Sequence, residues 1–322
     1  MATTGDETLL DEQRRRTQAG VAGIAAGILT MAGGALAAYV YSDIPAVPVV
    51  EALRERLEAG AGGPTLKARQ VLWYHDSASE LVLVAVVLAL AAAAIGLVLT
   101  HLFRSIKARR PETQNAIVYA AVAGSVLVAV SALAQALGVV VEAGSFADRP
   151  AAQQTSDAAR DVLQAPVVVA AGLLRLFGIF SLGIAFIYLA LNGMRVGLLT
   201  RFMGVLGIIV GVLFIVPLGS SLPIVQAFWL ASLGILFLGR WPSGQPPAWV
   251  TGDAQPWPTQ QELREARMEK QAASLDGDAE ERPRARFGRR ERAEPPETPA
   301  PELPVERKPH PSSKKKHKRK RR

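Results

Sequence analysis

Residues 81–103 read LVLVAVVLALAAAAIGLVLTHLF, 23 consecutive positions without an Asp, Glu, Lys or Arg. A bilayer core about 30 Å thick is crossed by about 20 apolar residues in an α-helix. Inside lipid the backbone must satisfy its own hydrogen bonds, so an uncharged run of this length predicts a transmembrane helix.

Comparable runs recur along the chain and predict an all-α fold, a polytopic transmembrane helix bundle of about six spans. The fifth and sixth runs are separated only by Gly219-Ser220-Ser221, which predicts a tight helical hairpin. One alternative makes the first run a signal peptide cleaved near Ala35-Leu36-Ala37, but its length and the acidic residues before it favour a retained span. The five further runs are 19–41, 116–141, 166–194, 202–218 and 222–239.

The composition distinguishes a mainly apolar chain from a basic cluster at its C-terminal end. Of the 322 residues, 50 % are apolar, and 36 Lys and Arg against 28 Asp and Glu give a net charge of +8. Eight of the basic residues lie in the last nine positions, so the rest of the chain is balanced at 28 against 28. This excludes a globally basic nucleic-acid-binding domain. The absence of Cys excludes disulfides, zinc–thiolate sites, iron–sulfur clusters and a thiol nucleophile.

The flanking charges predict the orientation, because short cytoplasmic loops are enriched in Lys and Arg. Basic residues gather at 14–16, at 104–110 and at Arg195 and Arg201, whereas the first two alternate loops mix both signs and the hairpin carries no charge. We expect an inner (plasma) membrane protein with both termini in the cytoplasm. The expected organisation is a flank at 1–18, a six-span domain at 19–240 with an outer loop at 42–80, a juxtamembrane segment at 241–273 and a tail at 274–322.

The juxtamembrane segment repeats Trp241, Trp249 and Trp257 among prolines. It is interpreted either as an interfacial anchor, since indole rings favour the headgroup layer, or as a docking strip for a partner. Thr259 and Glu262 form a capping box that predicts a short charged helix at 260–273. The tail beyond it is rich in Pro and charge, so it is predicted to be disordered.

The chain ends in a cluster that binds polyanions without geometric specificity. Expected partners are the lipid bilayer and its anionic headgroups, ribosomal RNA, or an acidic protein. The simpler interpretation is that this basic cluster only determines the topology of the chain in the membrane. The polyanion-binding residues are Lys314, Lys315, Lys316, Lys318, Arg319, Lys320, Arg321 and Arg322.

Arg175 is the one ionisable residue deep within an apolar run, and such residues are functional candidates. If the span begins at residue 176, Arg175 lies at the outer interface and snorkels. If one long helix runs from Pro166, Arg175 lies inside the membrane and needs a partner, for which Glu142 is the best candidate. Such a pair would fix helix packing or line a cavity.

The chemistry of most enzymes is missing. The sequence has no nucleotide-binding loop, no His-Glu-x-x-His motif and only four His, so we expect no enzyme, cofactor or metal site. Gly23-x-x-x-Gly27 and Gly207-x-x-x-Gly211 permit close helix approach and are compatible with a homo-oligomer.

The stretch 191–211, followed by Phe237-Leu238-Gly239-Arg240-Trp241-Pro242 and the Trp-Pro repeat, resembles uncharacterised six-span membrane proteins of high-GC actinobacteria. The resemblance covers 162–271 and implies an inner-membrane location. The basic tail is also similar to the tails of Oxa-family insertases, which carry an Arg in a membrane-embedded groove.

Two classes of function remain open. The first is a structural or interaction module whose tail is the working part. The alternative is a transporter or channel with Arg175 in its pathway, or a membrane-protein insertion factor.

Overall fold

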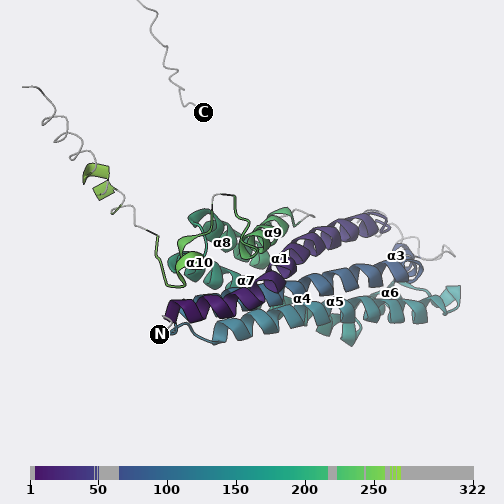
Figure 1. The fold of residues 1–322 in the computed structure, drawn as a ribbon. Helices are drawn as coiled ribbons and strands as arrows, with labels where there is room; N and C mark the ends of the chain where they lie inside the picture. The colour runs from purple at the N-terminus through teal and green to yellow at the C-terminus, as the bar shows by residue number, and fades with distance from the viewer. Residues whose placement is uncertain are drawn as a thin grey trace, which may run out of the picture. The chain divides into compact units, whose positions relative to one another are not determined.

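The computed structural model describes residues 4–46, 48, 50, 65–216, 223–242, 244–257, 262, 264–265 and 267–269, with side chains from residue 15 onward. The chain divides into two compact units, Met1–Thr259 and Gln260–Arg322. Every regular element in the described ranges is helical. Figure 1 shows the arrangement of these helices within the first unit.

Four helices are long and apolar enough to cross a membrane, and they confirm the first four predicted spans. At 1.5 Å per residue, the 32 residues of α4 extend about 48 Å. These helices therefore exceed the hydrocarbon core and continue beyond it. The four are α1 (Thr4–Ser42), α4 (Ala78–Arg109), α5 (Ala116–Ala147) and α7 (Pro166–Arg195).

Two further apolar helices are shorter than predicted: α8 (Arg201–Ile215) has 15 residues and α9 (Ile224–Phe237) has 14. They extend only about 22 and 21 Å. A proline accounts for the end of α8 and another for the start of α9, because the residue before a proline avoids helical angles. Val216, which precedes Pro217, is extended at φ −119° and ψ 94°, and Pro223 is the N-cap of α9. The predicted hairpin tip, 217–222, lies outside the described residues.

Large apolar side chains on the helix surfaces show which faces meet lipid. On α5, Tyr119, Val122, Val126 and Val130 follow a helical stripe and are all exposed. Similar exposed stripes run along α4, α7 and α8. Soluble proteins rarely expose apolar patches of this extent, so the surrounding solvent of these faces is the bilayer.

The helices pack in a defined order. α1 lies between α4 and α9, α5 lies between α4 and α7, and α8 packs on α7. The short helix α10 (Pro247–Thr251) lies at one end of this bundle, while α3 (Leu66–Asp76) and α6 (Ser156–Leu163) lie at the other (Figure 1). A single 3₁₀ turn, η1 (Ala151–Gln153), precedes α6.

The end that carries α3 and α6 has a hydrophobic core of its own. α3 lies within the predicted outer loop 42–80. The hydroxyls of Thr65 and Thr155 cap the two helices, each accepting a hydrogen bond of 3.3 Å from a backbone N–H three residues on. Pro166 is the first residue of α7, and the chain leaves the helical conformation just before it, so α6 and α7 are separate helices. The core comprises Ala68, Val71, Ala143, Phe146, Ala159 and Val162.

Glycines bring α1 and α9 into backbone contact. A Cβ atom at Gly23 would lie 2.6 Å from the Cα of Gly234, and one at Gly27 would lie 2.7 Å from the carbonyl oxygen of Ala227. Gly207 and Gly211 likewise face α7. Because lipid provides no hydrophobic gain on helix association, such close approach is a principal source of packing energy. Both glycine motifs therefore mediate helix contacts within a single chain.

We predict that Gly23→Ala destabilises the bundle by about 1–3 kcal/mol, the usual cost of overpacking. The added methyl group collides with the backbone of α9, which has no flexible end to move aside. The matched control is Gly172→Ala on α7, where a Cβ meets nothing within 4 Å. Thermal aggregation followed by size-exclusion chromatography in detergent measures both, and equal midpoints for the two variants would contradict this packing.

Candidate functional site

Basic side chains gather at the end of the bundle where α1 enters and α9 leaves. We call this the basic end. Here α4 and α7 finish, and α5 and α8 start, so six helix ends meet in one region. The contributing residues are Arg15, Arg16, Arg104, Lys107, Arg109, Arg110, Arg195, Arg201 and Arg240.

The centre of the basic end is the indole of Trp249 on α10, which is only 3 % exposed. The guanidinium carbons of Arg16 and Arg109 each lie 5.4 Å from its ring centroid, within cation–π range. The ring of His101 is nearly parallel to it at 6.4 Å, and Phe237 meets it edge-on at 5.7 Å. One side chain thus contacts α1, α4 and α9.

The two arginines also hold backbone carbonyls. Arg109 donates to the carbonyl of Ala248 through Nη2 at 2.6 Å and Nε at 3.1 Å, and to that of Ser105 through Nη1 at 3.0 Å. Arg16 donates to the Phe237 carbonyl and to Oε1 of Gln245. Away from bulk water such charge-assisted bonds are stronger than neutral ones. The guanidinium groups therefore fix both the ring and the chain that carries it.

The segment 246–257, which we call the strap, folds back onto the turn between α7 and α8. The indole nitrogens of Trp249 and Trp257 donate to the carbonyls of Leu198 and Leu199, each at 2.8 Å. The backbone N–H of Gln255 donates to the Val196 carbonyl at 3.0 Å. Trp249 is therefore neither an interfacial anchor nor part of an open docking strip, because protein surrounds its ring.

Gly197 makes the strap possible. Its φ of +78° is unfavourable for residues with a Cβ, and a Cβ atom there would overlap the carbonyl oxygen of Gln255. The α7–α8 turn therefore has no side chain where the strap crosses it.

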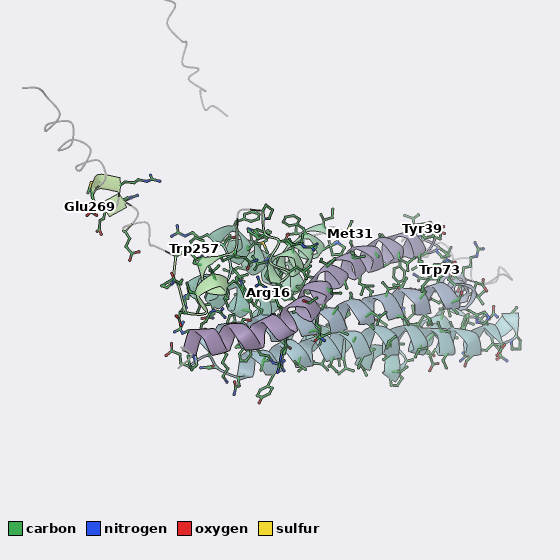
Figure 2. The ribbon with its side chains drawn as sticks, viewed as in Figure 1. Arg16, Met31, Tyr39, Trp73, Trp257 and Glu269 are labelled. Atoms are coloured by element: carbon green, nitrogen blue, oxygen red, sulfur yellow. The ribbon has the colours of Figure 1, made fainter. Side chains whose placement is uncertain are left out.

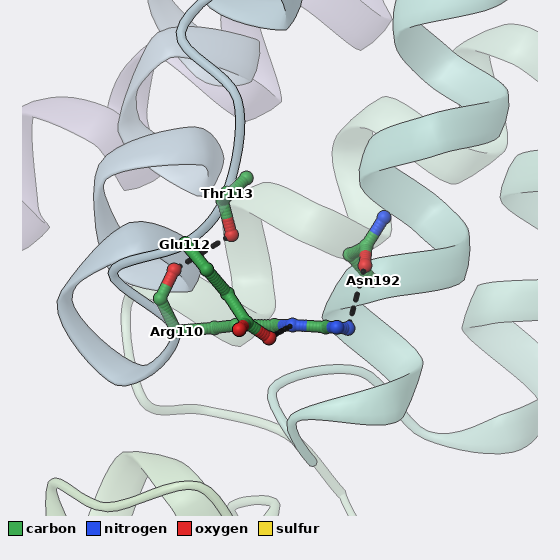
Figure 3. A network of polar contacts seen from close by, with 4 residues as sticks. All are labelled: Arg110, Glu112, Thr113 and Asn192. Carbon is green, nitrogen blue, oxygen red and sulfur yellow. Dashed lines mark hydrogen bonds and ion pairs between the residues drawn. The ribbon is translucent and has the colours of Figure 1, made fainter.

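A second polar network ties the α4–α5 turn to α7 (Figure 3). Arg110 forms a 2.6 Å ion pair with Glu112, and its Nη1 donates to Oδ1 of Asn192 at 3.4 Å. The hydroxyl of Thr113 donates to the Arg110 carbonyl at 2.7 Å. The ion pair is largely exposed, so it contributes little to stability and mainly orients the turn.

The predicted partners Arg175 and Glu142 are not brought together. The contacts between α5 and α7 pair Gly124 with Leu182, Val128 with Gly178, and Gly138 with Val167. The two helices are antiparallel, so Arg175, three residues before Gly178 on α7, lies level with residue 131, three residues after Val128 on α5. Residue 131 is 11 residues before Glu142. The axial separation is about 17 Å, so no ion pair forms.

Arg175 is exposed on α7, which is one continuous helix from Pro166 to Arg195. At the end of α1, the ring of Tyr41 lies 6.4 Å from that of Trp73. Trp73 in turn meets Tyr74 at 5.3 Å. Burial raises the pKa of Tyr74 above its ordinary value of 10.0, and Tyr41 raises it further, so this phenol is neutral at physiological pH. Figure 2 shows Tyr39 and Trp73 at the same end of the bundle.

The remaining predictions for this part of the chain are tested only in part. In the second unit, the described residues of the predicted charged helix, at 262, 264–265 and 267–269, are helical. The polyanion-binding residues 314–322 lie outside the described residues. Within the described ranges, no three His, Asp or Glu side chains gather to hold a metal ion.

The fold and the basic end together define a class: the chain is a multi-pass membrane protein whose described elements are all helical. No family model, curated protein or solved structure matches it. The resemblance to actinobacterial six-span proteins therefore stays a prediction.

The Trp249 cluster was missed by sequence reasoning because its members come from four separate segments. Each had a local explanation: Arg16 and Arg109 as topology signals, His101 as part of the apolar run 81–103, and Trp249 as an interfacial aromatic. The sequence offered one signal in Gly252, since a glycine often follows the last residue of a helix, and in the structure it ends α10 at a left-handed φ of +79°.

We predict that Gly197→Ala releases the strap, because the new methyl group overlaps the Gln255 carbonyl. The measurement is the rate of chymotrypsin cleavage after Trp249 in detergent, which should rise about tenfold or more if the substitution lowers the free energy of opening the strap by at least about 1.4 kcal/mol. Gly244→Ala is the matched control: its φ is +85°, but its Cβ meets nothing within 4 Å. Comparable cleavage in both variants would mean that backbone strain, not the strap contact, decides the result.

Proposed function

We propose that this chain is a six-span anchor of the plasma (inner) membrane, and that it presents its C-terminal region on the cytoplasmic side as an interaction module. In this proposal the polybasic end, 314–322, contacts the anionic lipid headgroups of the membrane that the chain already spans. The proposal assigns it no catalytic role.

The strap is the observation that carries the proposal. A passive connection after α9 would need none of the contacts of Trp249 and Trp257 with the α7–α8 turn. These contacts, with the two arginines over Trp249, fix the point at which the chain leaves the first unit. An attached segment that starts from a fixed point at the membrane surface meets its target at high effective concentration.

The basic residues at the helix ends support the proposed orientation. The helices α8 and α9 support the proposed number of six spans. All nine basic residues of the basic end flank membrane helices, the pattern expected for the cytoplasmic side. α8 starts and α9 ends at this side, with Arg201 and Arg240 at their boundaries. The two helices are short for a complete crossing, which local thinning of the bilayer accommodates at modest cost.

The placement of Arg175 weakens the alternatives. A transport pathway, or an insertase-like groove, needs this side chain to line an interior or embedded surface. Arg175 is instead exposed, between the exposed side chains of Leu173 and Leu176. Lipid contact at the tail is also favoured over ribosomal RNA, because the headgroups are already adjacent to the anchored chain.

The test compares the full chain in nanodiscs of phosphatidylcholine with and without phosphatidylglycerol. We expect trypsin to cleave the polybasic end roughly tenfold more slowly when anionic lipid is present, because each Lys or Arg near the surface gains about 1 kcal/mol. Protection should disappear at high salt. The control is a full-length variant with the eight Lys and Arg residues of 314–322 replaced by Gln, whose remaining tail sites should be cleaved at equal rates in both nanodiscs.

Equal cleavage of the native tail in both nanodiscs would contradict the lipid contact. Co-sedimentation of the full chain with ribosomes in either nanodisc, lost on truncation after Ser313, would instead assign the tail to RNA.

A further inference from the structure

One face of α7 is covered by α8 over part of its length and exposed beyond it. Gly183 contacts Ile215 of α8. Seven residues further along the same face, Ala190 contacts Gly207. α8 ends at Ile215, and Leu176, seven residues before Gly183, continues the face and is exposed. Within the described residues, this face of α7 therefore stays uncovered past the end of α8.

Arg175 lies at the edge of this uncovered part, which we call the open face. It is exposed, and no hydrogen bond or ion pair in the described part of the chain reaches its guanidinium group. Three residues before it, a Cβ atom at Gly172 would meet nothing within 4 Å, so another backbone can approach closely there. The open face comprises Val169, Gly172, Arg175 and Leu176.

The register of α7 on α5 gives the depth of Arg175. The antiparallel contacts of the two helices place Arg175 level with residue 131 of α5. The exposed apolar side chains of α5 extend from Tyr119 to Val141. At 1.5 Å per residue, residue 131 is about 18 Å from the first and about 15 Å from the second. Arg175 is therefore near the middle of the bilayer, where a cation without an anion is costly.

The chain itself supplies no carboxylate at this depth. A second copy in the same bilayer has the same orientation, so it would bring its own Arg175, another cation, to this level. The anion that complements Arg175 must therefore come from a different molecule. Asp and Glu are absent from all six apolar runs, 19–41, 81–103, 116–141, 166–194, 202–218 and 222–239.

We propose that the open face binds a transmembrane helix of a different membrane protein, one that carries an Asp or Glu near the middle of the bilayer. The guanidinium group of Arg175 pairs with this carboxylate, and Gly172 lets the partner backbone approach. Val169 and Leu176 pack against the apolar side chains of the partner. Each charge is costly in lipid without the other, so the pair selects the partner. This contact is separate from the tail and does not rest on its lipid contact.

The test uses a synthetic transmembrane peptide of about 20 Leu and Ala residues with one central Glu, and a second peptide with Gln in its place. Both peptides carry a Cys one helical turn to each side of the centre, so that either orientation reports. The full chain has no Cys, so Gly172→Cys in phosphatidylcholine vesicles reports the contact as a disulfide under mild oxidation. We expect the Glu peptide to cross-link roughly tenfold faster than the Gln peptide, because only Glu forms a charged pair.

Further substitutions in the Gly172→Cys chain show whether Arg175 causes the difference. Arg175→Gln should remove the preference for the Glu peptide, and Arg175→Lys should keep part of it. The matched control is Arg195→Gln, which removes an exposed arginine at the end of the same helix and should leave the preference unchanged. A Cys placed instead at Leu173, on the other side of α7, should cross-link slowly to both peptides.

Equal cross-linking of the Glu and Gln peptides to the chain that retains Arg175 would overturn the proposal, and this comparison needs no substitution of Arg175. So would a Glu preference that persists in Arg175→Gln, or faster cross-linking at Leu173→Cys. Cross-linking of Gly172→Cys chains to one another without peptide would assign the open face to a second copy. A preference that vanishes when phosphatidylglycerol replaces phosphatidylcholine would assign it to an anionic lipid.

Discussion

The burial of Trp249 at the basic end is the interaction on which the arrangement of this protein depends. Its indole contacts Arg16 on α1, Arg109 and His101 on α4, and Phe237 on α9, and it donates to the turn after α7. In a bilayer the helices gain no hydrophobic energy from associating. A residue from outside the spans that joins several helix ends therefore does what a hydrophobic core does in a soluble protein.

The rest of the bundle obeys the same constraint in another way. Along the spans the helices approach through glycine, as Gly23 and Gly234 do between α1 and α9. Beyond the spans, where water returns, α3, α5 and α6 form a small conventional core around Phe146. Packing by small residues within lipid and by large apolar residues outside it follows from the change of solvent.

The long helices followed from the sequence because apolar run length reports directly on a bilayer of fixed thickness. Helix ends were less predictable: α8 ends at Ile215 because Pro217 constrains its predecessor. Relations between segments were not accessible. The Arg175–Glu142 pair was wrong because span boundaries do not give the register of α5 on α7. The strap was missed because an indole near a membrane has an ordinary interfacial explanation, and only the tertiary contacts show that Trp249 is enclosed.

The central claim, that the strap is fixed on the α7–α8 turn, is tested most directly by disulfide trapping in membranes. The chain has no Cys, so Val196→Cys with Gln255→Cys gives a signal without background. Backbone atoms of these residues are hydrogen-bonded at 3.0 Å, and the account predicts rapid, near-complete cross-linking under mild oxidation. The pair Gly172→Cys and Gln255→Cys should not cross-link, since the Cβ position of residue 172 meets nothing within 4 Å. Equal, slow cross-linking of both pairs would contradict the fixed strap.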